Sequence, residues 1–313
     1  MDLSDTKSEE NVNIDTTTPF ETLTPLPVPL CQSQCVIYKD EILICGGYYE
    51  RNCYSYHTLK NQYKRICSYP SNVVLEGHCV VRVVSNNKDK NTITLLSFSG
   101  YPKHTLMMTY VSIWDDDESN VEEESKTKNK KHCNEWVTFI DDSDNKRPIH
   151  IAKDTENYEG ARAVIGGSNK HLLFITYPPK NVDVFDLNTC RYIKHDILPM
   201  EENKVWYHGF VSTTQNTNEM LLFYNKTGLT IDYNENSNEF KFYAIPVCDE
   251  MVPLKRYANV CIGDVVVNFG GWSGYIGQNE AISNAVHMYS MKESKWIKLE
   301  HVYHFPYMIV LWC

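Results

Sequence analysis

The sequence VVVNFGGW, residues 265–272, is followed by a polar loop and by AVHMYSMKESKW, residues 285–296. Val265–Phe269 is short and rich in β-branched residues, which predicts a buried strand. The diglycine 270–271 ends this strand at a point where a side chain would block the approach of another backbone. Tyr289 and Trp296 then lie seven residues apart around the polar turn 292–295. One such unit is weak evidence, so the prediction depends on finding it elsewhere in the chain.

The same unit recurs along the chain with a period close to about 50 residues. Its second aromatic residue falls at positions 63, 136, 192, 240 and 296. Four units share the seven-residue aromatic spacing, and in the second unit the charged run 115–132 separates Trp114 from Trp136. Each unit predicts a twisted sheet of four antiparallel strands with two apolar faces, which is buried only by stacking against its neighbours.

This pattern resembles the kelch repeat, and the resemblance spans residues 20–312. It implies an all-β fold, a kelch-type β-propeller with five recognisable four-stranded blades plus a partial sixth. The third and fourth units depart from the family pattern because they lack the diglycine. In the partial sixth blade, YMIVL at 307–311 is the expected inner strand and residues 20–24 are a candidate outer strand. The repeated aromatic residues are expected to pack between blades.

The domain organisation predicted from composition is simple. Residues 1–19 are polar and are expected to form a disordered N-terminal tail, and residues 20–313 form the propeller. The insertion 115–132 in the second blade is acidic first and basic second, which predicts a disordered, solvated loop. The chain has 42% hydrophobic residues, which is enough for a large core.

Charge and cysteine content narrow the class of partner and the compartment. A formal net charge of -10 argues against nucleic acid as the default partner. The first 19 residues lack the apolar core of a signal peptide, and no apolar run is long enough to cross a membrane. The 11 cysteines are interpreted as small buried residues of a cytoplasmic protein, because no second Cys/His pair lies at zinc-ligand spacing.

Motifs for catalysis are missing from the sequence, which contains no GxSxG, HExxH, Walker or dinucleotide pattern. We therefore expect no enzyme activity, no catalytic residue, no metal and no cofactor. One enzymatic alternative stays open, because a galactose-oxidase-like copper enzyme also uses kelch blades. Such an enzyme needs two tyrosines and two histidines around one metal, and no spacing in this chain nominates them.

The function implied by the resemblance is a non-catalytic scaffold that binds other proteins through its propeller loops. The alternative within this class is a substrate-recognition subunit of a ubiquitin ligase. Such subunits normally carry an additional adaptor domain, and only about 30 residues precede the first blade, which is too few for one. This observation favours the free-standing scaffold.

The binding face predicted from the sequence is the set of loops between the second and third strands of the blades. All of these loops open at the same end of a propeller, and four successive blades place a cation there. Converging cations on an acidic protein attract anionic groups, and aromatic side chains serve as interface anchors. The expected partner is a protein or an acidic peptide. The residues predicted to bind it are Tyr48, Tyr49, Arg51, Tyr101, Lys103, His104, Lys180, Lys226, Trp272 and Tyr275.

Overall fold

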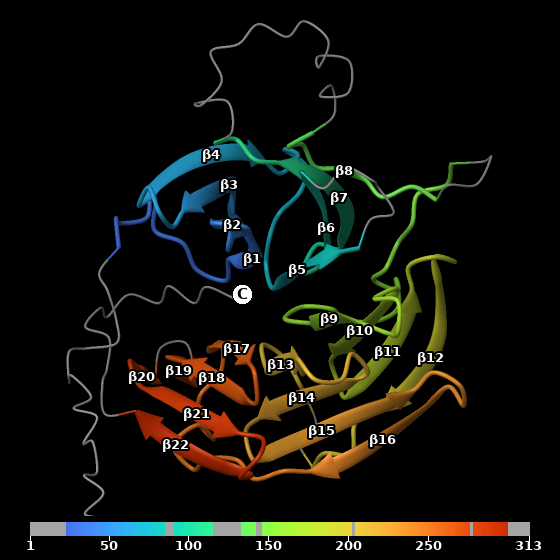
Figure 1. The fold of residues 1–313 in the computed structure, drawn as a ribbon, viewed down its shortest axis with the longest axis vertical. Coiled ribbons are helices and arrows are strands. Elements are labelled where there is room, and N and C mark those ends of the chain that lie inside the picture. Colours follow the sequence, from blue (N-terminus) through green and yellow to red (C-terminus); the bar gives the residue numbers. More distant parts are fainter. Residues whose placement is uncertain are drawn as a thin grey trace, which may run out of the picture.

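The computed structural model describes residues 23–84, 91–114, 133–141, 146–201, 204–275 and 278–299. In these ranges the chain forms strands and no helices, and the strands build five four-stranded antiparallel sheets around one axis (Figure 1). The predicted all-β propeller with five four-stranded blades is therefore confirmed.

Four blades use four strands that are consecutive in the sequence. Blade 1 contains β1 (Gln34–Tyr38), β2 (Glu41–Gly47), β3 (Glu50–His57) and β4 (Gln62–Ser68). Blade 2 contains β5 (His78–Val83), β6 (Thr92–Ser99), β7 (His104–Val111) and β8 (Val137–Thr138). Blade 3 contains β9 (Arg162–Gly166), β10 (Leu172–Tyr177), β11 (Asn181–Asp186) and β12 (Arg191–Ile197). Blade 4 contains β13 (Gly209–Ser212), β14 (Glu219–Tyr224), β15 (Thr227–Asn234) and β16 (Glu239–Ala244).

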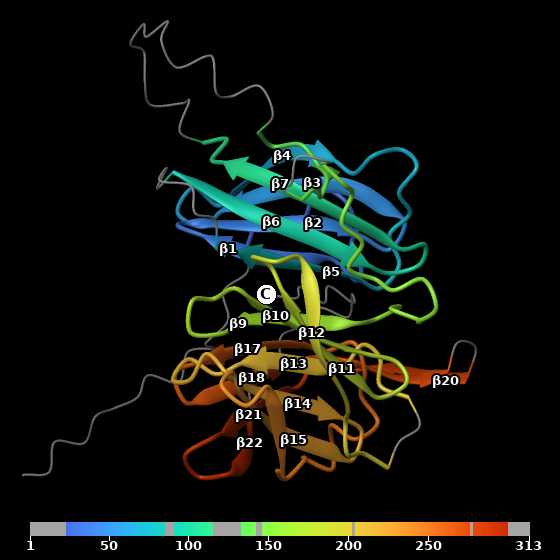
Figure 2. The ribbon, with the colours of Figure 1, turned by 90° about the vertical axis from the view of Figure 1, so that its right-hand side faces the viewer.

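Blade 5 differs because a two-stranded hairpin interrupts it. Its sheet contains β17 (Ala258–Ile262), β18 (Val265–Phe269), β21 (Val286–Ser290) and β22 (Lys295–Leu299). The segment predicted as a loop after the diglycine instead forms a separate hairpin of β19 (Trp272–Tyr275) and β20 (Gln278–Ile282). This hairpin projects beyond the rest of blade 5 (Figure 2).

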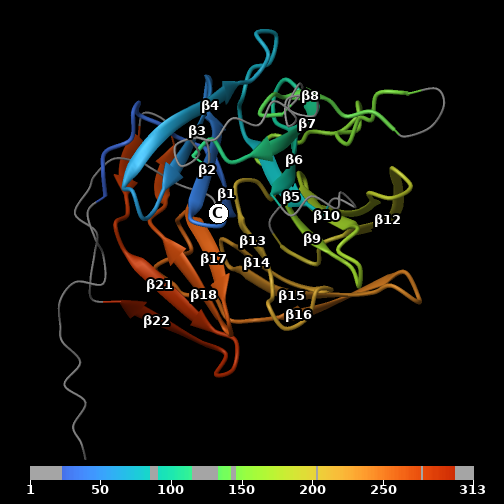
Figure 3. The same cartoon turned by 45° about the horizontal axis from the view of Figure 1, so that its top comes forward.

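The first strand of each blade lies nearest the axis, and β1, β5, β9, β13 and β17 follow one another around it (Figure 3). An apolar core lies between each pair of successive blades from 1 to 5. A fifth cluster lies on the other face of blade 1, where Leu26, Val28 and Leu30 cover Ile44 and Tyr54. The described residues form no apolar cluster that joins blade 5 to blade 1.

The seven-residue aromatic spacing corresponds to direct pairing across the third and fourth strands. Each pair with this spacing occupies opposite positions in the register, with ring centroids 4.8–5.2 Å apart. Directly opposed side chains are the unit that stabilises an antiparallel pair. The four pairs are Tyr56 with Tyr63, Phe185 with Tyr192, Tyr233 with Phe240, and Tyr289 with Trp296.

Trp114 and Trp136 do not form the expected pair in blade 2. The strand β8 has only two residues and lies opposite Leu106 and Met107, so it does not reach the end of β7 where Trp114 lies. Both rings pack against blade 1 instead. The indole of Trp114 donates a hydrogen bond to Ser55 Oγ at 2.9 Å, and Trp136 stacks on Tyr69 with centroids 4.6 Å apart.

Three predictions fall on parts of the chain outside the described residues. These are the disordered tail 1–19, the disordered insertion 115–132 and the inner strand of a partial sixth blade at 307–311. Of the candidate outer strand 20–24, the structure describes only the last two residues. Thr24 is not in a strand, and its amide and hydroxyl donate hydrogen bonds to Asn61 Oδ1 and Asn61 O in the β3–β4 turn.

The entry to each inner strand is a residue with positive φ, and these five residues encircle the axis. We call them the axial ring: Gln32, Gly77, Gly160, Tyr207 and Arg256, with φ from 50° to 69°. Their amides pass hydrogen bonds from blade to blade. The amide of Gly160 donates to Gly77 O at 3.0 Å, that of Tyr207 to Gly160 O at 2.8 Å, and that of Arg256 to Tyr207 O at 3.1 Å. Gly77 in turn donates to Gln32 Oε1 at 2.9 Å.

Substitution of Gly160 by alanine tests this ring. A Cβ at Gly160 would lie 2.7 Å from Tyr207 Cδ2 and 2.9 Å from Tyr207 N, in a left-handed conformation. Gly263 has a similar φ of 61°, but a Cβ there meets nothing within 4 Å. Gly263→Ala should therefore lower the free energy of unfolding only by the strain of the left-handed conformation, about 1–2 kcal/mol. We expect Gly160→Ala to lower the free energy of unfolding by at least about 2 kcal/mol more. Urea denaturation of both variants measures this difference, and equal losses would contradict it.

Candidate functional site

One end of the propeller carries two kinds of connection, and we call it the loop end. In an antiparallel four-stranded blade, the loop between the second and third strands emerges at the same end as the connection that enters the first strand. The two kinds of connection are hydrogen-bonded to each other. The amide of Tyr49 donates to Leu75 O at 3.0 Å, and that of Tyr101 donates to Glu76 O at 3.0 Å. The loops predicted to bind a partner therefore sit on a fixed backbone.

Three of the predicted aromatic residues are displayed to solvent at the loop end. Tyr48, Tyr49 and Tyr101 are 43%, 64% and 67% exposed. Tyr48 and Tyr49 contact each other edge to face with centroids 4.5 Å apart. Tyr101 lies in a hollow of about 440 Å³ with Lys103, Glu156 and Glu159. Exposed aromatic rings on a hydrogen-bonded loop are the kind of residue that anchors a protein partner.

The ammonium groups of Lys103 and Lys180 are engaged in intramolecular hydrogen bonds. Lys103 Nζ donates to the carbonyl oxygens of Lys153 and Asp154 at 2.6 and 2.8 Å. Lys180 Nζ donates to Met200 O at 2.7 Å. Both side chains are half-buried. Their hydrogen bonds tie each loop to the connection that enters the following blade.

His104, also predicted to bind the partner, does not add positive charge to the loop end. Its Nε2 bonds Ser97 Oγ at 2.8 Å, and its Nδ1 is buried with no hydrogen-bond partner. Burial, together with nearby His78, lowers the pKa of His104 to about 3, so the ring is neutral. Its ring packs against Tyr69 with centroids 5.9 Å apart.

The remaining predicted residues are Arg51, Lys226, Trp272 and Tyr275. Arg51 and Lys226 are exposed, in blades 1 and 4. Trp272 is half-buried at the base of the β19–β20 hairpin, and its backbone exchanges two hydrogen bonds with Lys255. Tyr275 is in β19, and its side chain lies outside the described part of the structure.

Four residues that the sequence analysis missed lie on the connections that enter blades 4 and 5: Lys204, Trp206, Lys255 and Arg256. Together with the predicted Trp272 on β19 they form a group that we call the basic–aromatic cluster. Lys204 Nζ lies 4.2 Å from the Trp206 ring centroid, and the Arg256 guanidinium lies 5.4 Å from that of Trp272 and 4.4 Å from that of Tyr207. Burial and then the charges of Arg256 and Lys204 lower the pKa of Lys255. Cations are therefore gathered here among aromatic faces.

Two carboxylates lie near the axis on the connections that enter blades 2 and 3. Burial and the charge of Glu159 raise the pKa of Glu76, and Arg256 acts in the opposite direction. Glu159 also accepts a hydrogen bond from Tyr207 OH at 3.4 Å, and it lines the hollow beside Tyr101 with Glu156. Because the Arg256 guanidinium packs on the same Tyr207 ring, acidic and basic groups meet near the axis at the loop end.

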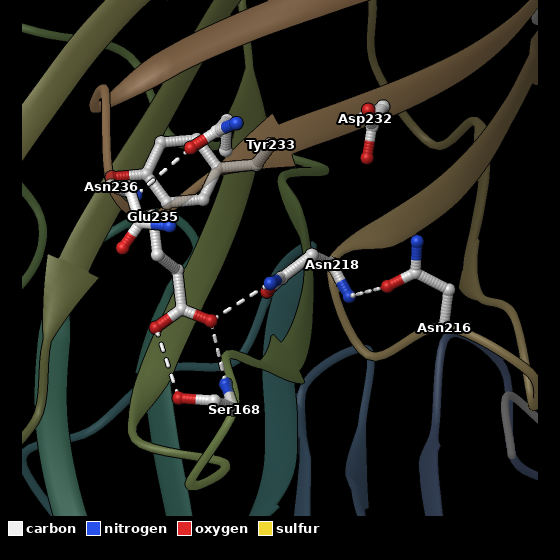
Figure 4. Close-up of a pocket in the computed structure, with 8 residues that line it drawn as sticks. Ser168, Asn216, Asn218, Asp232, Tyr233, Glu235 and Asn236 are labelled. Atoms are coloured by element: carbon white, nitrogen blue, oxygen red, sulfur yellow. Dashed lines mark hydrogen bonds between the residues drawn. The ribbon is translucent and has the colours of Figure 1, made fainter.

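A second hollow, of about 340 Å³, lies at the opposite end of the propeller between blades 3 and 4 (Figure 4). The Glu235 carboxylate accepts hydrogen bonds from the Ser168 amide at 2.7 Å and from Asn218 Nδ2 at 2.8 Å, and Asn216 Oδ1 accepts from the Asn218 amide (Figure 4). These polar groups hydrogen-bond to one another across the hollow, so we interpret it as a contact between blades 3 and 4.

Within the described ranges, no group of three or more His, Cys, Asp or Glu side chains is arranged to hold a metal ion. The same ranges contain no helix with the length and hydropathy that a membrane span requires.

The fold is a β-propeller whose loop end carries aromatic and charged side chains. The structure is similar to that of YjhT, with a TM-score of 0.60 and 12% identity over 91% of this chain and 88% of YjhT. It is also similar to a fungal alcohol oxidase of the AA5 family in complex with copper, with a TM-score of 0.54 and 8% identity. That match covers 89% of this chain and 54% of the oxidase. No family model and no curated protein matches the chain.

The buried histidines give a testable pH dependence. His78 Nε2–H donates to Cys45 O at 3.0 Å, so protonation would place a proton on the buried, partnerless Nδ1. Burial lowers the pKa of His78 to about 4 and that of His104 to about 3. The unfolded chain takes up these protons below about pH 6.5, whereas the folded chain does not. The neutral rings therefore make their whole contribution to the free energy of unfolding above about pH 6.5, and this contribution is lost as the pH falls toward 4.

We expect His104→Gln to remove part of this loss. Between pH 7 and pH 4, the variant should lose about 1–3 kcal/mol less unfolding free energy than the wild type. His150→Gln is the control, because His150 is exposed. Chemical denaturation at a series of pH values measures the slopes. Identical slopes for all three proteins would contradict the burial of a neutral His104.

Proposed function

We propose that this chain is a kelch-type propeller that acts as a non-catalytic interaction module in the cytoplasm, with its loop end as the binding surface. The partner is a protein that presents an acidic peptide segment to blades 4 and 5. The observation that carries this proposal is the basic–aromatic cluster. Its cations and indole rings lie side by side on connections held by the axial ring.

The ring position places a long side chain beside the cluster. Blades 2 and 3 have glycine at this position, whereas blades 1, 4 and 5 have Gln32, Tyr207 and Arg256. The Arg256 guanidinium lies 4.4 Å from the centroid of the buried Tyr207 ring, which helps to hold its charge in place.

Charge complementarity supports an acidic partner. The chain has a net charge of -10, so a local group of cations is the part of the surface that attracts an anionic segment. The half-buried rings of Trp206 and Trp272 offer apolar contact area beside the charges.

Binding of a fluorescein-labelled poly-glutamate peptide, followed by anisotropy at physiological salt, tests the proposal. The double variant Lys204→Glu/Arg256→Glu should bind the peptide about tenfold more weakly, because it replaces two attractive charges by repulsive ones. Lys241→Glu/Lys295→Glu is the matched control, because it makes the same charge change on exposed outer strands. Equal weakening by both double variants, or no weakening by the first, would overturn the proposal. Melting temperatures confirm that each variant is folded.

A further inference from the structure

One face of blade 5 is apolar but is not buried like its counterparts in the other blades. Side chains alternate between the two faces of a strand. In β18, Val266 is buried in the core shared with blade 4, whereas Val265, Val267 and Phe269 point to the other face and are half-buried. The second strands of the other blades, β2, β6, β10 and β14, are buried along nearly their whole length. We call the half-buried or exposed apolar side chains of this face the seam face: Val260, Val265, Val267, Phe269, Met288 and Ile297.

The seam face lies at the junction between blade 5 and blade 1. Adjacent inner strands contact each other at the other four junctions, from β1 to β5, β5 to β9, β9 to β13 and β13 to β17. In the described ranges, β17 and β1 have no comparable contact, and the axial hydrogen bonds between backbone groups stop at Arg256. On the far side of this junction, the segment 26–30 already covers the facing side of blade 1. Blade 1 therefore does not cover the seam face itself, and an apolar surface of this kind marks an interaction site.

The composition of the chain indicates what covers the seam face. Two segments at the ends of the sequence lie outside the described residues, 1–22 and 300–313. Residues 1–22 contain seven charged side chains, whereas residues 307–313 read YMIVLWC and contain none. Burial of apolar side chains stabilises, and burial of unpaired charges is costly. The segment 307–311 is therefore the better match for an apolar face.

The length of the chain beyond blade 5 allows this contact. Tyr307 is eight residues beyond Leu299, which ends β22. Eight extended residues span up to about 26 Å. The first and fourth strands of a sheet are only about 14 Å apart, because adjacent strands are separated by about 4.8 Å. In addition, the fourth strand of a blade runs toward the loop end, where the connections to the inner strands begin. Residues 300–306 are therefore long enough to reach the inner edge of blade 5.

We propose that the seam face is an intramolecular docking surface, and that its occupant is the chain's own segment 307–311. This segment packs against Val267 and Phe269 on one side and against the half-buried Leu26 and Val28 on the other, so it fills the junction between blades 5 and 1. A contact within one chain needs no partner at a particular concentration, which favours it over a second copy. The inference is independent of the acidic-peptide site, and its test uses no peptide.

Photo-cross-linking of the purified full chain tests the occupant. The photoreactive p-benzoylphenylalanine replaces Phe269 on the seam face, and the cross-linked peptides are mapped by mass spectrometry. We expect a cross-link to residues 307–311 within the same molecule, with a yield that does not change when the protein is diluted. The matched control carries the same residue at Tyr243, which is 54% exposed on the outer strand β16, and it should give no such cross-link.

The other outcomes of this experiment identify other occupants. A cross-link from position 269 to residues 1–22 would assign the seam face to the opposite end of the chain. A cross-linked dimer whose yield rises with protein concentration would assign it to a second copy. A cross-link to residues 23–30 alone would mean that blade 1 closes on blade 5 without the segment. Each of these three results would overturn the proposal.

A charge within the segment provides a second test. In the chain labelled at position 269, Ile309→Asp should lower the yield of the cross-link about tenfold, because docking would bury an unpaired carboxylate. Thr18→Asp makes the same change in residues 1–22 and should leave the yield unchanged. Hydroxyl-radical labelling shows whether the fold persists: Ile309→Asp should expose Met288 on the seam face but not Met220, which is buried between blades 3 and 4. An undiminished cross-link in Ile309→Asp would contradict the proposal.

Discussion

The axial ring is the constraint on which the rest of the propeller depends. Each blade could bury its faces against a neighbour in many relative positions, because apolar packing has little directional preference. A hydrogen bond between backbone groups does have direction and length. The bonds from Gly160 to Gly77, from Tyr207 to Gly160 and from Arg256 to Tyr207 therefore hold the inner strands of four blades at a defined spacing. Gln32 connects blade 1 through its side chain.

The loop end takes its properties from this arrangement. The second-to-third-strand loops bond to the connections that enter the inner strands, so displayed side chains such as Tyr49 and Tyr101 rest on anchored backbone. Two predicted cations, Lys103 and Lys180, serve this anchoring by donating to backbone carbonyls. Closer to the axis, the basic–aromatic cluster meets Glu76 and Glu159 at Tyr207, which contacts both Arg256 and Glu159. A partner would therefore meet charges of both signs near the axis.

The blade count and the aromatic pairs could be predicted because both follow from strand geometry. A spacing of seven residues around a short turn places two side chains directly opposite each other, as it does for Tyr289 and Trp296. Trp136 could not be placed in this way, because its ring stacks on Tyr69 of another blade and a two-residue strand carries no register signal. The cluster around Arg256 was missed because the connections that enter the blades differ in length and composition. Their equivalent positions become visible only in the structure, where each connection ends at a residue of the axial ring.

The direction of the axial hydrogen bonds has an electrostatic consequence. In an α-helix the peptide dipoles add along the axis and give each end a partial charge. In the axial ring the amides of Gly160, Tyr207 and Arg256 each point back to the preceding blade, so their dipoles run around the axis and not along it. These amides therefore add little field along the propeller axis. The potential above the loop end is set by side chains, and exchanging a few of them can redraw it without altering the scaffold.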